Sequence, residues 1–147
     1  MTELAHSLGS LVIIDGAHAP GALGIDVKAI GADYYLGNCH KWLYCPKGTG
    51  FMWVAPALQS EAIMQPTVIS ASGVHTFTGR FAYTGTRDYT PFACIPAALE
   101  FLEKELGGME AMQRYCSSLC ASAAQMLVEK WQTSLLVCWL HYCCCCK

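Results

Sequence analysis

Two side chains of opposite charge stand just after apolar segments that are typical of β-strands. Asp15 ends the run LVIID at residues 11–15, and Lys41 follows the segment DYYLGN at residues 33–38. In open α/β sheets, ligands bind beyond the carboxyl ends of the parallel strands. We therefore expect Asp15 and Lys41 to face the same pocket.

An aspartate and a lysine in one pocket match the requirements of pyridoxal phosphate. The lysine amine forms a Schiff base with this cofactor, and the aspartate pairs with the pyridinium nitrogen so that the ring remains an electron sink. Lysine suits this role because its pKa shifts readily on burial, so we expect Lys41 to be held inward and Asp15 to face a positive group. The spacing leaves two other interpretations open: both are ordinary surface residues, or they form a salt bridge.

The remaining sequence alternates between strand and helix patterns, which predicts an α/β fold. Strands are predicted at residues 11–15, 33–38 and 50–54. The first is a continuous β-branched run of the kind buried on both faces, and the short connection between the other two predicts an antiparallel pair. Helices are predicted at residues 2–8, at 26–32 with Asp26 as the N-cap, at about 90–106, and at 108 to about 131.

The composition indicates one globular domain with a large apolar surface. Of the 147 residues, 54% are hydrophobic and only 14% are charged, against roughly 25% charged in an average domain. Such a surface suits contact with another protein chain. The net charge of -2 and the lack of a basic stripe argue against a nucleic-acid partner. The first ten residues lack a signal-peptide pattern, so we expect a cytoplasmic location.

The ten cysteines fall into two groups of five. Five are scattered through ordinary sequence, which is typical of a reduced intracellular chain, and five lie in the apolar segment after residue 131. Four consecutive cysteines are poorly spaced for a zinc ion, so we expect no metal. The segment is too short to span a bilayer, although reversible acylation is an alternative use. We interpret residues 132–147 as a tail unrelated to the domain before it.

Two longer stretches resemble a known family. They are DGAHAPGALGIDVKAIGADYYLGNCHKWLYCPKGTGFMWV at residues 15–54 and GRFAYTGTRDYTPFACIPAALEF at residues 79–101. The combination of His-Lys, an aromatic residue, PKGTG and an apolar strand resembles the class V aminotransferases, a fold-type-I family of pyridoxal-phosphate enzymes. The GAHA and GTRD motifs resemble those of the family branch that contains isopenicillin N epimerase and cysteine desulfhydrase-like proteins. The resemblance covers about residues 1–130.

The resemblance implies roles for three residues around the cofactor ring. Lys41 would form the Schiff base, and Asp15 would pair with the pyridinium nitrogen. His18 matches the position whose side chain bonds the phenolic oxygen of the cofactor. The implied substrate is a small amino acid.

The resemblance also implies phosphate contacts and a homodimer with shared active sites. Asn38 and His40 match positions that touch the cofactor phosphate. Gly85 and Thr86 match a segment that reaches the phosphate of the partner subunit. The next two residues, 87–88, are expected to be structural.

The fold implied is part of a large pyridoxal-phosphate-binding domain, a mostly parallel sheet with flanking helices, truncated at both ends. Residues 1–106 would form this partial domain and residues 107–131 a helix leading toward a small carboxy-terminal domain. Family members are much longer, and the residue that stacks on the cofactor ring and the arginine for the substrate carboxylate are expected to lie outside this sequence. Cys39 and Cys45 flank Lys41 but do not replace the nucleophile of the desulfurases.

Two functional hypotheses follow. The first is an enzyme, or a piece of one, that acts on a small amino acid by C–S lyase or epimerase chemistry through the lysine Schiff base. The second is a catalytically inactive, truncated form that serves only as an interaction or dimerisation module.

Overall fold

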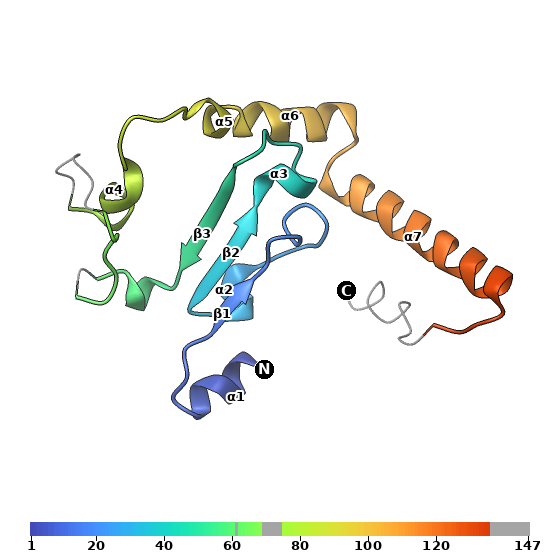
Figure 1. Ribbon diagram of the computed structural model, residues 1–147, viewed down its shortest axis with the longest axis horizontal. Helices are drawn as coiled ribbons and strands as arrows, with labels where there is room; N and C mark the ends of the chain where they lie inside the picture. Colours follow the sequence, from blue (N-terminus) through green and yellow to red (C-terminus); the bar gives the residue numbers. More distant parts are fainter. Residues whose placement is uncertain (61, 69–74, 136–147) are drawn as a thin grey trace.

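The computed structural model describes residues 1–60, 62–68 and 75–135, and a three-stranded sheet lies at its centre (Figure 1). The strands are β1 (Ile13–Asp15), β2 (Tyr34–Asn38) and β3 (Gly50–Val54), in the order β1-β2-β3. β1 and β2 are parallel, with Asp15 opposite Leu36. β2 and β3 are antiparallel, with Asn38 opposite Gly50, which confirms the predicted antiparallel pair.

Two predictions about the sheet are wrong for this chain. Within the described residues the sheet is mixed, with one parallel and one antiparallel pair, and not mostly parallel. β1 is an edge strand and not a strand buried on both faces, since Ile13 is 66% exposed. The apolar run predicts a covered strand, but in the described part of the chain β1 is hydrogen-bonded to β2 alone.

The helices surround this sheet on several sides (Figure 1). They are α1 (Thr2–Ser7), α2 (Val27–Ile30), α3 (Cys39–Trp42), α4 (Phe77–Ala82), α5 (Thr90–Ala93), α6 (Ile95–Glu105) and α7 (Met109–Trp131), with a 3₁₀ turn, η1, at Pro56–Leu58. The predicted Asp26 N-cap is confirmed, because its Oδ1 accepts the N–H groups of Lys28 at 2.9 Å and Ala29 at 3.0 Å.

One predicted helix is two in the structure, and two short helices were not predicted. The segment 90–106 is divided at Cys94 into α5 and α6, because Pro96 has no N–H to continue the hydrogen-bond ladder of α5. α3 and α4 have four and six residues, too few for a helical period to show in the sequence. The hydroxyl of Thr76 caps α4 by accepting the N–H of Gly79 at 3.2 Å.

The buried core is small and is divided between the sheet and α6. Tyr35 and Val54 are each 2% exposed, and the Tyr35 ring stacks on Phe51 with centroids 6.3 Å apart. A second cluster, here called the thiol cluster, contains Cys39, Cys45 and Ala98, with Leu43 and Ile95 packed against it. It joins the segment around α3 to the start of α6.

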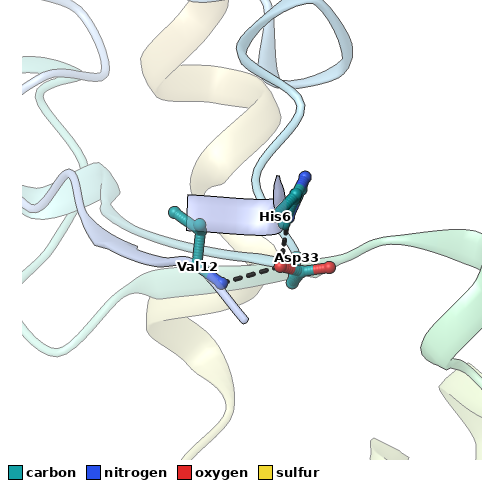
Figure 2. A network of polar contacts seen from close by, with 3 residues as sticks. All are labelled: His6, Val12 and Asp33. Carbon is teal, nitrogen blue, oxygen red and sulfur yellow. Dashed lines mark hydrogen bonds and ion pairs between the residues drawn. The ribbon is translucent and has the colours of Figure 1, made fainter. Parts of the chain in front are cut away.

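A polar network ties α1 to the sheet at the end opposite Asp15. Figure 2 shows Asp33 between its two partners: Oδ2 accepts the N–H of Val12 at 2.7 Å and the ring Nε2–H of His6 at 2.8 Å. The Val12 N–H and then His6 hold the pKa of Asp33 below its ordinary value. One carboxylate therefore joins the helix, the strand that follows it and the start of β2.

α7 extends away from the sheet (Figure 1) and buries only Met112. Its first turns touch the domain through Gln113, whose Nε2 donates to the carbonyl oxygen of Gly21 at 3.1 Å. Farther along, Tyr115 is 68% exposed and Trp131 is 66% exposed. Among the described residues no helix is both long and apolar enough to cross a membrane. Residues 136–147 of the predicted cysteine-rich tail lie outside the described part.

Candidate functional site

An open hollow lies where β1 and β2 end and β3 begins. Its volume is about 570 Å³, within the roughly 300–1,000 Å³ typical of small-molecule sites. Three candidate residues line it: Asp15, Asn38 and Lys41. The rest of its wall comes from Ala17, Leu36, Gly37, Gly50, Phe51 and Met52. The structure thus brings Asp15 and Lys41 to one hollow at the edge that the strand pattern indicated.

The Asp15 carboxylate is held by the turn that leaves β1. Its Oδ1 accepts the N–H of Ala17 at 3.0 Å, which orients the carboxylate at the strand end. Asp15 is exposed and has no ion pair with Lys41 or any other described residue. The expectation that it faces a positive group, the pyridinium nitrogen of the cofactor, stays a prediction.

Lys41 lies in α3 and lines the hollow at the end of the sheet. The sequence placed it in a loop between two strands, whereas the structure places it in a single helical turn that follows β2 directly. Its side chain is exposed, so the expectation that it is held inward is wrong for this chain. The exposed Lys41 side chain lines the hollow and is open to a molecule bound there.

Asn38 and two glycines form a close-packed wall of the hollow. A Cβ on Gly50 would lie 3.0 Å from the carbonyl oxygen of Gly37 and 3.1 Å from Oδ1 of Asn38. A Cβ on Gly37 would lie 2.5 Å from the ring of Phe51. A side chain at position 50 would therefore crowd the Asn38 amide, and one at position 37 would displace the Phe51 ring.

His40 does not line the hollow, and its ring bonds instead to the backbone at Thr49. Its Nδ1–H donates to the carbonyl oxygen of Thr49 at 2.7 Å, and the same oxygen accepts the N–H of Cys39 at 3.1 Å. Thr49 is 0% exposed, and its hydroxyl donates to the carbonyl oxygen of Pro46 at 2.8 Å. Thr49 therefore anchors the first turn of α3, a role that the sequence analysis missed. The PKGTG turn is the only signal that could have pointed to it.

Three other candidates lie outside the hollow. His18 is exposed in the turn after β1. Gly85, with a φ of +120°, and Thr86 lie in the loop between α4 and α5. The Gly85 carbonyl oxygen accepts the Tyr89 hydroxyl at 3.0 Å, and Thr86 Oγ1 lies 3.4 Å from the hydroxyl of Tyr83.

The arginine after Thr86 is held by aromatic rings. The guanidinium carbon of Arg87 lies 4.9 Å from the ring centroid of Tyr89 and 5.5 Å from that of Phe92. The Oδ1 of Asp88 accepts the N–H of Thr90, the first residue of α5, at 2.8 Å. These contacts order the loop between α4 and α5.

The hollow combines three kinds of polar group that recognise different parts of a ligand. The Lys41 amine can bond to a carbonyl or an anion, the Asp15 carboxylate can accept a cationic N–H, and the Asn38 amide can donate to an anionic oxygen. Leu36, Phe51 and Met52 add apolar area to the wall of the hollow. This combination suits a small molecule that carries both charged and apolar groups.

Comparison with known proteins assigns the chain to a family. The family described as aminotransferase class-V matches residues 1–139. An L-cysteine desulfhydrase from Arabidopsis thaliana is 35% identical over 124 residues, which are 84% of this chain and 27% of that protein. An isopenicillin N epimerase from Streptomyces clavuligerus is 37% identical over 123 residues, 73% of this chain and 30% of that protein.

Solved structures show the same fold. A cysteine desulfurase from Thermococcus onnurineus NA1 superposes with a TM-score of 0.72 at 20% sequence identity, over 86% of this chain and 33% of that one. A cysteine desulfurase from Escherichia coli gives a TM-score of 0.65 at 25% identity, over 90% of this chain and 33% of that one. The chain thus spans about a third or less of the proteins that it matches, and it belongs to the class-V aminotransferase family.

Proposed function

We propose that this chain carries the lysine-bearing part of a pyridoxal-phosphate site that acts on a small amino acid, by C–S lyase or epimerase chemistry. The observation that supports this proposal is the meeting of Asp15, Asn38 and Lys41 in one hollow at the strand ends. The similarity to a cysteine desulfhydrase and an isopenicillin N epimerase supports the two reaction types. Residues 1–106 would form the cofactor domain, and 107–131 the helix that leaves it.

The donor set and the space both fit the cofactor. Pyridoxal phosphate, when bound, supplies an electron-withdrawing ring that stabilises negative charge on a substrate carbon. Lys41 would bind the cofactor covalently and move a proton at the substrate α-carbon, and Asp15 would hold a proton on the ring nitrogen. Asn38, which lines the hollow, would bind the phosphate through its amide.

Four further residues complete the proposed site. His40, oriented by the Thr49 carbonyl, would bind the phosphate alongside Asn38. His18 would bind the phenolic oxygen. Gly85 and Thr86 lie outside this chain's hollow, and we propose that they reach the phosphate in the partner's site of a homodimer.

A second candidate function is an inactive module that binds another protein. The observation that favours it is the exposed apolar surface of the sheet, where Ile13 is 66% and Met52 is 41% exposed. Such a surface suits association with another chain. The two functions differ in whether Lys41 reacts with the cofactor.

Borohydride trapping tests the proposed site directly. The full chain is mixed with pyridoxal phosphate, reduced to make the lysine–pyridoxyl bond permanent, and mapped by peptide mass spectrometry. We expect the label on Lys41 and not on Lys28 or Lys47, which lie away from the wall of the hollow. Trypsin will fail to cut after a labelled lysine, which gives a second readout.

Matched variants distinguish specific labelling of Lys41 from nonspecific labelling of exposed lysines. Lys41→Arg should abolish the label, whereas Lys47→Arg should leave it unchanged. Equal labelling of several lysines, or labelling that survives Lys41→Arg, would favour the inactive module. Where labelling succeeds, sulfide release from L-cysteine identifies lyase chemistry, and loss of optical rotation without sulfide identifies epimerisation.

A further inference from the structure

We propose that Cys39 and Cys45 form a dithiol site that hydrogen peroxide oxidises to a disulfide, which encloses Lys41 in the loop 39–45. Both residues are 6% exposed, and they pack with Ala98 of α6 in the thiol cluster. Cys39 is the first residue of α3, and Cys45 lies just beyond its end. The lysine is therefore carried by the short segment between the two thiols.

The two thiols interact with each other in the reduced chain. Their side chains pack together in the thiol cluster, and the Cys45 thiol donates to the carbonyl oxygen of Leu43 at 3.4 Å. Burial raises the pKa of both thiols. The Cys45 thiol proton is donated to the Leu43 carbonyl oxygen, so we assign the attack on the oxidant to Cys39, which reacts as its thiolate.

A third thiol stands near the pair. Cys94, at the break between α5 and α6, is half-buried, and its charge contributes to the raised pKa of Cys45. In the described part of the chain, no three His, Cys, Asp or Glu side chains are grouped so that they could hold a metal ion.

The oxidation proceeds in two balanced steps. The Cys39 thiolate attacks one oxygen of hydrogen peroxide, the O–O bond breaks, and the released hydroxide takes up a proton to become water. The Cys45 sulfur then attacks the sulfenic sulfur of Cys39. The S–S bond forms as the S–O bond breaks, and the hydroxide leaves with the thiol proton of Cys45 as a second water. The two sulfurs supply the two electrons that reduce the peroxide.

The disulfide would change the position of Lys41. A disulfide has an S–S distance of about 2.05 Å, shorter than the contact between two separate thiols, so the segment 39–45 that carries Lys41 must rearrange when the bond forms. Misplacing a reacting group by about 1 Å can cost roughly 100-fold in rate. We therefore expect oxidation to lower pyridoxal-phosphate labelling of Lys41 by at least about tenfold. This consequence rests on the proposed function, whereas the disulfide itself does not.

Trypsin separates the relevant cysteines, so peptide mapping tests the pairing. Cleavage after Lys28, Lys41 and Lys47 places Cys39 in residues 29–41 and Cys45 in residues 42–47. The native full chain is treated with hydrogen peroxide, its remaining thiols are alkylated, and the digest is analysed without reduction. We expect a dominant species in which peptides 29–41 and 42–47 are joined, and its loss on treatment with dithiothreitol. The same oxidation after unfolding in guanidinium chloride should give mixed pairs.

Two variants, Cys45→Ser and Cys94→Ser, decide between the outcomes. Cys45→Ser should remove the joined peptides and keep Lys41 labelling after peroxide, whereas Cys94→Ser should leave the joined peptides in place. A dominant Cys39–Cys94 link, or the same mixture of pairs from native and unfolded chain, would overturn the dithiol site. If the joined peptides form and Lys41 labelling does not fall, the effect on Lys41 is refuted. If Lys41 is unlabelled even before oxidation, the proposed function fails and the disulfide result stands alone.

Discussion

Two fully buried side chains near the hollow carry a hydroxyl group, and only one of these hydroxyls has a partner. Thr49 donates to the carbonyl oxygen of Pro46, as described above, and its own carbonyl oxygen anchors α3. The Tyr35 hydroxyl lies against Gly16 and has no hydrogen-bond partner among the described residues. Burial raises the pKa of Tyr35, so the hydroxyl stays neutral. The two residues form a matched pair for measuring the effect of a buried hydroxyl.

We expect Thr49→Val to lower the free energy of unfolding by about 0.5–1.5 kcal/mol, because the hydrogen bond from the Thr49 hydroxyl to the Pro46 carbonyl oxygen is lost. Tyr35→Phe removes a hydroxyl that makes no bond, so it should leave that free energy unchanged or raise it. Urea unfolding followed by tryptophan fluorescence, at one protein concentration, measures both variants. Equal losses in the two variants would show that the Thr49 hydroxyl contributes nothing specific.

At the scale of the elements, α1 depends on a single carboxylate for its attachment to the sheet. Asp33 binds both the Val12 backbone and the His6 ring, and no side chain of α1 is buried. The lowered pKa of Asp33 means that the folded chain favours its ionised form. The stabilisation is therefore present above the ordinary pKa of aspartate, about 4, and is lost as the pH falls through the lowered folded value.

We expect Asp33→Asn to lower the urea midpoint at neutral pH, with a difference from wild type that shrinks as the pH falls below about 4. The amide keeps the shape of the carboxylate but removes its charge, so the pH dependence reports on the charge itself. Glu3→Gln, an exposed neutralisation within α1, serves as the control and should change the midpoint little. A difference between wild type and Asp33→Asn that is independent of pH would contradict the assignment.

At the scale of the whole molecule, one face of the sheet is left open. Residues that lie two apart in a strand share a face, so Ile13, Leu36 and Met52 lie on the face that also carries Asp15. They are 66%, 39% and 41% exposed. Exposed apolar groups of this size on adjacent strands favour association with another chain, which would also remove water from the hollow.

We expect the purified chain to elute from size exclusion, in reducing buffer, as oligomers larger than its 16.0 kDa mass. Ile13→Lys should shift the profile toward monomer, because it places a charge on the open face of an edge strand. Leu8→Lys changes a residue that is 75% exposed beside α1 and should have no such effect. A monodisperse wild-type monomer would contradict association through this face.

Several elements could be predicted from a few neighbouring residues. The strand at Gly50–Val54, the long helix α7 and the Asp26 cap each depend on periodicity or on contacts within one turn. The placement of Asp15 and Lys41 at one edge also followed, because strand direction carries both to the same end of the sheet.

Other features depend on packing between residues far apart in the sequence, and only the tertiary structure decided them. The apolar run before Asp15 predicts a covered strand. The exposure of that strand depends on which other segments pack beside it, and the run itself does not specify them. The anchoring of α3 by Thr49 likewise appeared only in the folded chain. The contact between Cys39 and Cys45 required the turn after α3 to fold back beneath α6. Sequence pattern reports what a segment favours locally, whereas burial and the membership of a site are properties of the whole packing arrangement.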